Sequence, residues 1–212
     1  MKVNKVGRRL LSLGIVSLAT SHVASAAELT ILDAHLIGGW TGASVSGEGA
    51  ESEVKSSKSM SYGLGVGIEI PLAESFGIVT GLDYVHRKFE VGYDEARLEK
   101  TVPTFILPVM ARAWLGNAFY LQGGLYAAKA VGDNKYNVVS GDEDLIGWDY
   151  KDRRSVDFGL IAGLGVNIAM FGKTGLYVQG QYLHGFSDSA GASVMEERVR
   201  DIQISTGVRI EI

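Results

Sequence analysis

The segment VDFGLIAGLGVNIAM, residues 156–170, alternates between two kinds of residue along its whole length. One set of alternate positions is large and apolar, and the other set is mostly glycine with a few polar residues. A period of two residues is that of a β-strand with two different faces. The glycine-rich face is too small to fill the wide core of a soluble protein. We therefore predict that the large face meets lipid and the small face lines a narrow lumen.

Residues 60–72 and 202–212 repeat this alternation clearly. Less regular strands are predicted at 31–46, 76–88, 102–115, 119–131 and 174–186. Short turns are expected near 73–75, 116–118 and 171–174, and long polar loops near 47–59, 89–101, 132–155 and 187–198. This pattern predicts an all-β fold, an eight-stranded antiparallel transmembrane β-barrel with short periplasmic turns and long extracellular loops. The alternative, a soluble barrel, would need its large apolar face to point inward.

The aromatic residues favour the membrane interpretation. Five of them fall on outward positions toward the outer ends of their strands: Trp40, Tyr62, Tyr84, Phe158 and Tyr182. Three others lie near the short turns: Phe76, Phe119 and Phe171. Two aromatic belts, one at each membrane interface, are typical of such barrels.

The N-terminal segment has the features of an export signal. Four of its first nine residues are basic, a mostly apolar run follows at 10–19, and an Ala-x-Ala motif lies at 24–26. This order predicts a signal peptide that is cleaved after Ala26, with residues 27–212 forming the barrel. We therefore expect the mature protein in the outer membrane of a Gram-negative bacterium.

Composition excludes several function classes. The chain contains no cysteine, which excludes disulfides, thiol catalysis and cysteine-ligated metals. Four of the 20 Lys and Arg residues and none of the 24 Asp and Glu residues precede the predicted cleavage site. The mature chain then has 16 basic and 24 acidic residues, a net charge of −8 that argues against nucleic acid as a partner.

Three short stretches carry a resemblance to a known family. The segment DFGLIAGLGV at 157–166 resembles the sixth strand of the PorT-like outer-membrane β-barrels, and QYLHGF at 181–186 is similar to the strand that follows it. The stretch at 107–109 resembles the proline-containing segment of the fourth strand. The transmembrane domains of OmpX and OmpA share the same eight-stranded plan. One departure is the terminal Ile212, since such barrels often end in an aromatic residue. The resemblance permits a role in a secretion system.

Charged residues on inward positions predict a polar plug at the periplasmic end of the lumen. Its members are Asp33, His35, Glu69, Arg112, Arg209 and Glu211. Buried charges need partners, so we expect the two glutamates to pair with the two arginines. The plug is interpreted as structural, closing the lumen; a gate or a narrow pore is the alternative.

An enzyme is a weaker interpretation of the same scaffold. Outer-membrane barrels that modify lipid carry a histidine with a serine or an acid near the outer leaflet, and here His86, His184 and Ser187 fall near that rim. His184 and Ser187 are three positions apart on an extended chain and so point to opposite faces. We therefore predict no catalytic residues, no cofactor and no metal site.

The third loop, 132–155, mixes acidic and basic residues and also holds Tyr136, Trp148 and Tyr150. Its acidic spacing does not match an EF-hand, and rigid aromatic residues are common in protein interfaces. We expect a non-enzymatic barrel that is structural or binds a partner through its extracellular loops. The expected partners are outer-membrane lipid and lipopolysaccharide, the barrel-assembly machinery during biogenesis, and an extracellular or envelope protein.

Overall fold

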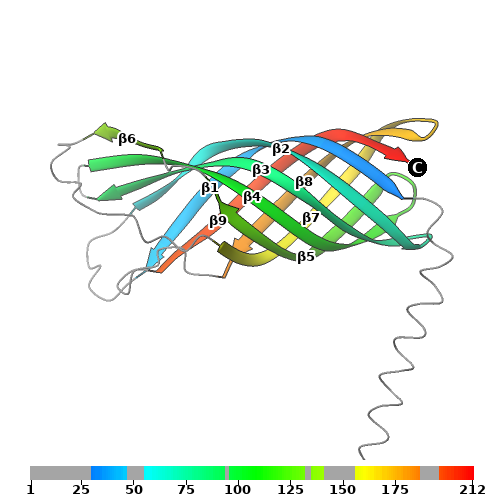
Figure 1. Cartoon of the computed structure of the whole chain (residues 1–212), viewed down its shortest axis with the longest axis horizontal. Coiled ribbons are helices and arrows are strands. Elements are labelled where there is room, and N and C mark those ends of the chain that lie inside the picture. Colours follow the sequence, from blue (N-terminus) through cyan, green and yellow to red (C-terminus); the bar gives the residue numbers. More distant parts are fainter. Residues whose placement is uncertain (1–29, 47–54, 94–95, 132–134, 141–155, 187–195) are drawn as a thin grey trace, which may run out of the picture.

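A computed structural model describes residues 30–46, 55–93, 96–131, 135–140, 156–186 and 196–212. These residues form the following strands (Figure 1): β1 (Ile31–Ser46), β2 (Lys55–Ala73), β3 (Phe76–Tyr93), β4 (Ala96–Leu115), β5 (Phe119–Ala130), β6 (Lys135–Ser140), β7 (Val156–Phe171), β8 (Thr174–Gly185) and β9 (Glu196–Glu211). No helix within these described segments is long and apolar enough to cross a membrane.

The strands form one closed antiparallel sheet. Its order is β3-β2-β1-β9-β8-β7-β5-β4-β6, and a further pairing of β3 with β4 closes the ring. The short strand β6 continues β5, because both pair with β4: Ala130 lies opposite Thr104, and Lys135 lies opposite Thr101. The closed ring therefore has eight strands, and the predicted eight-stranded antiparallel barrel is confirmed.

The two faces of each strand differ as the alternation predicts. On β9, Ile202, Ile204 and Ile210 are 43%, 50% and 46% exposed, whereas the intervening Gln203 and Ser205 are buried. The same contrast runs around the barrel, where large apolar side chains form a continuous outward band. Because these side chains have no protein to pack against, their burial depends on lipid.

Glycines on the inner face make room for large side chains from neighbouring strands. A β-carbon at Gly165 would collide with the ring of Tyr120, and one at Gly159 would collide with the ring of Tyr126. Both tyrosines are almost completely buried. A narrow lumen is therefore filled by pairing large residues with glycines across adjacent strands.

The short turns lie where they are predicted, and two of them contain a glycine in the left-handed region, Gly116 (φ 71°) and Gly172 (φ 62°). β1 begins and β9 ends at this same end of the barrel, since Ile31 lies opposite Glu211 (Figure 1). With the turns and termini on the periplasmic side, the opposite end of the barrel faces the exterior.

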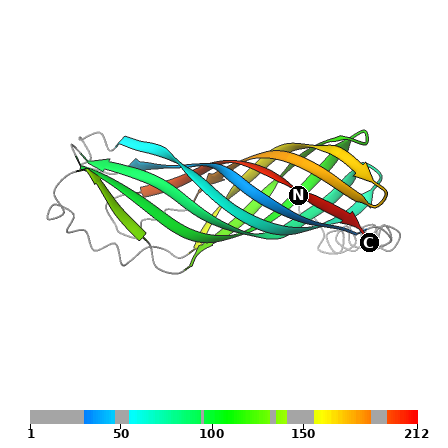
Figure 2. The same cartoon turned by 90° about the horizontal axis from the view of Figure 1, so that it is seen from above.

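The predicted bounds of the four long loops are partly wrong, because the strands continue into each of them. β2 begins at Lys55, β3 and β4 are separated by residues 94–95 alone, β6 lies inside the third predicted loop, and β9 begins at Glu196. Figure 2 shows that β3, β4 and β6 project past the ends of β7 and β8. Lipid-facing alternation is needed only inside the membrane, so backbone pairing that continues outside it leaves no period-two signal.

Candidate functional site: the polar network of the lumen

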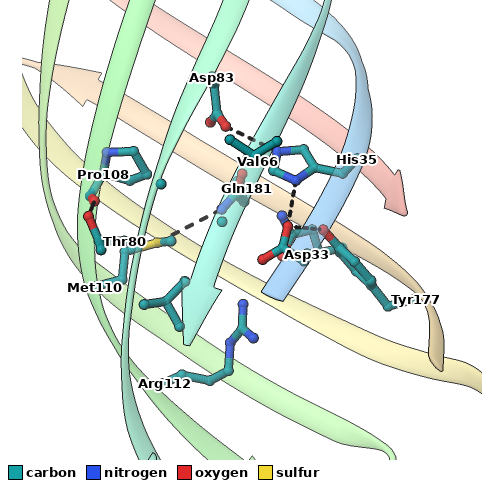
Figure 3. A pocket seen from close by; sticks show the side chains of 14 residues that line it. Asp33, His35, Val66, Thr80, Asp83, Pro108, Met110, Arg112, Tyr177 and Gln181 are labelled. Carbon is teal, nitrogen blue, oxygen red and sulfur yellow. Dashed lines mark hydrogen bonds and ion pairs between the residues drawn. The ribbon is translucent and has the colours of Figure 1, made fainter. Parts of the chain in front are cut away.

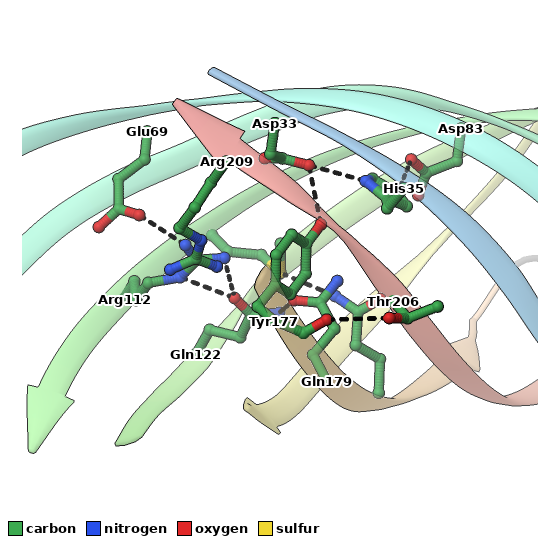
Figure 4. A network of polar contacts seen from close by, with 12 residues as sticks. Asp33, His35, Glu69, Asp83, Arg112, Gln122, Tyr177, Gln179, Thr206 and Arg209 are labelled. Atoms are coloured by element: carbon green, nitrogen blue, oxygen red, sulfur yellow. Dashed lines mark hydrogen bonds and ion pairs between the residues drawn. The ribbon is translucent and has the colours of Figure 1, made fainter. Parts of the chain in front are cut away.

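The inward positions of β1, β2, β4 and β9 bring charged side chains together near the periplasmic end of the barrel (Figure 4). Arg112 and Glu69 form the tightest pair, with 2.5 Å between Arg112 Nη1 and Glu69 Oε2. Arg112 also donates from Nε and Nη2 to Gln122 Oε1, at 3.0 and 2.7 Å, and Trp114 Nε1 donates to Glu69 Oε1 at 2.8 Å. The pair is buried and most of its hydrogen-bonding groups are satisfied, as a buried ion pair requires.

Arg209 contacts aromatic rings, whereas the sequence analysis predicts an ion pair with a glutamate. Its guanidinium carbon lies 4.4 Å from the ring centre of Tyr177 and 5.1 Å from that of Tyr120, and Nη2 donates to the Tyr120 hydroxyl at 3.3 Å. The expected ion pair between Glu211 and Arg209 is not formed among the side chains that the structure describes. Aromatic faces stabilise the arginine charge in place of a carboxylate.

His35 lies between two carboxylates (Figure 3). Its Nδ1 is 2.7 Å from Asp33 Oδ1, and its Nε2 is 3.1 Å from Asp83 Oδ1. The Tyr177 hydroxyl donates to Asp33 at 2.9 Å. A cavity of about 20 Å³ borders these residues and Arg112, which is room for a single water molecule. The sequence places Asp33, His35 and Asp83 inward, but it does not show that a histidine from β1 reaches across to β3.

A second charged cluster lies toward the outer end and is missing from the sequence prediction. Arg87 Nη2 is 2.6 Å from Asp201 Oδ2, Arg87 Nη1 is 3.9 Å from Asp157 Oδ2, and Tyr126 donates to Asp157 at 3.3 Å. A usable signal existed, because Arg87 is four residues after the inward Asp83 and therefore points to the same face.

An apolar cluster lies in the lumen between the two charged clusters. It consists of buried side chains from six strands: Ile37, Val79, Val85, Ile106, Met110, Tyr126, Ala128, Ile161 and Leu183. Val85 and Ile106 are completely inaccessible to solvent. The described lumen is thus filled with side chains, with charges toward both ends and, between them, this apolar cluster beside buried polar residues such as Gln181 and Gln203.

The candidate enzymatic residues lie outside this network. His86 stacks on Tyr62, with ring centres 5.0 Å apart, and His184 is 3.3 Å from the hydroxyl of Tyr182. Ser187 falls outside the described residues. Among the residues that are described, no group of three or more His, Cys, Asp or Glu is arranged to hold a metal ion.

The predicted partner-contact residues are only partly placed. Tyr136 lies in β6, where its backbone pairs with Lys100 of β4. Trp148 and Tyr150 lie outside the described residues. The backbone of β6 thus belongs to the part of the sheet that projects from the outer end of the barrel (Figure 2).

The comparison with solved structures finds outer-membrane and surface proteins from several bacteria. OprG from Pseudomonas aeruginosa aligns with a TM-score of 0.55 and 12% identity, over 87% of this chain and 96% of OprG. Neisserial surface protein A aligns with a TM-score of 0.41 and 11% identity, over 86% of this chain and 97% of that protein. The Ail protein of Yersinia pestis aligns with a TM-score of 0.37 and 10% identity, over 84% and 98%.

Curated proteins provide no match to this sequence. The outer membrane protein beta-barrel domain family matches residues 32–191, which is more than half of the chain. Lipid-facing strands, a filled lumen and this match together lead to one conclusion: the chain belongs to the outer membrane protein beta-barrel domain family and lies in the outer membrane of a Gram-negative bacterium.

Proposed function

We propose that this protein is a closed, non-catalytic outer-membrane barrel that binds a protein partner through the part projecting into the exterior. The observation that carries the proposal is the filled lumen. Residues along the whole lumen are at most 4% exposed. They include Arg112 and Glu69 toward one end, Ile106 in the middle, and Arg87 and Asp201 toward the other end. Solute passage would require breaking buried ion pairs, which is costly when one charge is left unpaired.

The outer extension supplies a surface for a partner. The ladder of β3 with β4 continues outward to Tyr93 opposite Ala96. β2 pairs with the other side of β3 there, and β6 adds a further strand from Lys135 to Ser140. Within the described residues β6 pairs with β4 alone, so its second edge offers backbone N–H and C=O groups. An extended peptide can add to such an edge, with main-chain hydrogen bonds giving affinity.

A planar-bilayer recording tests the closed lumen. The full chain, refolded and inserted, is expected to give no steady conductance, because buried side chains fill the described lumen. Steady channels of uniform size would contradict the proposal and favour the narrow pore.

Site-specific photocrosslinking in the native bacterium tests partner binding. A photoreactive residue at Tyr136 in β6 is expected to give one discrete protein adduct. The same residue at Leu164, which is 63% exposed on the lipid-facing wall, serves as the control and is expected to give none. Equal adduct patterns at both positions, or none at Tyr136, would contradict a partner on this extension.

The two remaining alternatives make different predictions. The resemblance to PorT-like barrels supports a secretion-system component as the partner, and mass spectrometry of the Tyr136 adduct would identify such a protein. A lipid-modifying enzyme would change the mass of lipid A in cells that express the chain, and His184→Ala would abolish the change. We expect unchanged lipid A in both cases.

A further inference from the structure

The histidine of the plug contacts two carboxylates through its two ring nitrogens. His35 Nδ1 is 2.7 Å from Asp33 Oδ1, and His35 Nε2 is 3.1 Å from Asp83 Oδ1 (Figure 4). All three side chains are at most 9% exposed. An ionised carboxylate only accepts hydrogen bonds, and a neutral imidazole has a single N–H to donate. Two ring nitrogens that each donate to a carboxylate therefore require an imidazolium ion, which holds one proton more than the neutral ring.

Two glycines of β2 make this contact possible. Gly65 lies in register between His35 and Asp83, and a β-carbon there would be 2.2 Å from Asp83 Oδ1 and 2.5 Å from His35 Nε2. Gly67 leaves space for Asp33 in the same way, because a β-carbon at this position would be 2.3 Å from Asp33 Oδ2. The histidine of β1 thus reaches over β2 to the aspartate of β3, across a place that any larger residue would occupy.

The charges around His35 balance when its ring is protonated. The other strands of the network contribute tyrosine hydroxyls, which are uncharged at neutral pH, from β5 and β8. Two positive and three negative side chains sum to −1, and an imidazolium brings the sum to zero. Unbalanced charge is costly in a buried network, so the fold favours the protonated ring. The five charged side chains of the network are Asp33 of β1, Glu69 of β2, Asp83 of β3, Arg112 of β4 and Arg209 of β9.

We propose that Asp33, His35 and Asp83 form a proton-binding site, in which His35 is an imidazolium at neutral pH and fastens β1 to β3 across β2. Loss of this proton would leave one of the two carboxylates without its N–H donor, and it would leave an excess negative charge in the lumen. The plug is therefore expected to be held tightly at neutral pH and to loosen as the pH rises.

This inference does not depend on the proposed function. The proton is detected at His35, whereas the partner is detected at Tyr136 and the closed lumen by conductance. A neutral His35 would leave the photocrosslink unaffected, and loss of the crosslink would leave the protonation of His35 unaffected.

Nitrogen-15 NMR of the imidazole ring reports the number of protons directly. The chain has four histidines, so His22→Gln with His86→Gln and His184→Gln leaves His35 as the only one. In nanodiscs at pH 8 we expect both ring nitrogens of His35 to carry a proton. In the same chain unfolded in urea, about 3% of the rings should be protonated at this pH. A neutral His35 ring in the folded barrel at pH 8 would overturn the proposal.

The dependence of stability on pH provides a second test. The folded barrel holds a proton that the unfolded chain releases above about pH 6.5, so stability must fall as the pH rises above this value. Between pH 7.5 and 8.5 we expect the ratio of folded to unfolded protein, from urea titrations, to fall by up to about tenfold, the limit for one proton. His35→Gln should abolish this change. His184→Gln, which removes a histidine of the lipid-facing wall, is the matched control and should retain it. An equal pH dependence in the unmodified chain and in His35→Gln would overturn the proposal.

A double substitution tests the role of the positive charge. His35→Gln leaves two carboxylates facing each other without a cation between them, and Asp83→Asn in the same chain removes one of these carboxylates. The double variant is therefore expected to unfold at a higher urea concentration than His35→Gln alone. A lower midpoint in the double variant would show that the two carboxylates need no positive charge between them, and it would contradict the proposal. The NMR measurement changes nothing at the site, so it decides the proposal if His35→Gln does not fold.

Discussion

Glu69 carries the negative charge that balances Arg112 inside the barrel. Both side chains are at most 3% exposed, and Trp114 donates to the same carboxylate. Glu69→Gln would keep the shape of the side chain but leave the arginine charge buried without its partner. We expect the free energy of unfolding to fall by about 3–5 kcal/mol, the usual result of breaking a buried pair on one side. Urea titration followed by tryptophan fluorescence would measure this change.

Removing both charges gives a different expectation. In Glu69→Leu with Arg112→Met, neither charge remains to be buried, so the double variant should lose less stability than Glu69→Gln. Glu74→Gln, in the exposed turn between β2 and β3, should change stability by no more than about 0.5 kcal/mol. A double variant that is less stable than the single one would show that the pair contributes net stability beyond charge balance.

At the scale of residues, the sequence predicts which face a side chain occupies and fails to predict which side chain it meets. The inward positions of Glu69 and Arg112 follow from the period of two. The contact of Arg209 with the rings of Tyr120 and Tyr177 joins three strands, and it depends on the stagger of the closed barrel, which no local pattern encodes. Glu211 lies on the same face of β9 as Arg209, but sharing a face does not bring the two side chains within ion-pair distance.

At the scale of elements, the described strands have unequal lengths. β4 has 20 residues, whereas β5 and β8 have 12 each. The sequence predicts β5 and β8 well, because almost all of their length lies within the lipid-facing band. It underestimates β3 and β4, whose outer residues 89–93 and 96–101 lie beyond the segments predicted from the alternation. Asp201 illustrates the limit, since it precedes the alternating segment 202–212 by one residue and contributes to the outer charged cluster.

The outer halves of β3 and β4 are expected to open more readily than the inner halves. Their pairing from Phe89 opposite Lys100 to Tyr93 opposite Ala96 lies beyond the lipid-facing band, and its neighbours are the outer end of β2 and the short strand β6. Local opening costs little where few buried contacts are lost. Amides of 89–93 should therefore exchange with deuterium at least about 100-fold faster than amides of 77–85, from a difference in opening free energy of about 3 kcal/mol.

Hydrogen exchange with mass spectrometry, on the full chain in nanodiscs, would compare the two segments. Both belong to β3, so each serves as the reference for the other. Equal protection of 89–93 and 77–85 would mean that a bound partner or another part of the chain stabilises the extension. Protection that rises on adding native outer membranes would favour the proposed partner.

At the scale of the whole molecule, the pairing of β1 with β9 is the step that makes a barrel from a sheet. The two strands are paired from Ile31 opposite Glu211 to Ser46 opposite Glu196, along the whole length of both. They are also far apart in sequence, so closure forms contacts of large sequence separation. Such contacts are slow to form because loop-closure entropy is lost before they stabilise the fold.

Two adjacent glycines of β1 allow a test of closure with a matched control. A β-carbon at Gly39 would collide with the backbone of Ile202 and Gln203 in β9, whereas one at Gly38 meets nothing within 4 Å. A backbone atom cannot rotate out of the way as a side chain can. Gly39→Ala must therefore displace β9 where it pairs with β1. We expect Gly39→Ala to cost about 1–3 kcal/mol and to slow folding into vesicles, and Gly38→Ala to change stability by at most about 0.5 kcal/mol.

The mobility of unheated samples on a gel separates closed from open barrels, and its time course during folding measures closure directly. The two variants share the strand, the substitution and the change in helix or strand propensity. They differ only in the face to which the new methyl group points. Equal effects of the two substitutions would mean that replacing a glycine in β1 acts through the conformational entropy of the unfolded chain. A defect confined to Gly39→Ala would mean that close approach of β1 and β9 limits how the sheet becomes a barrel.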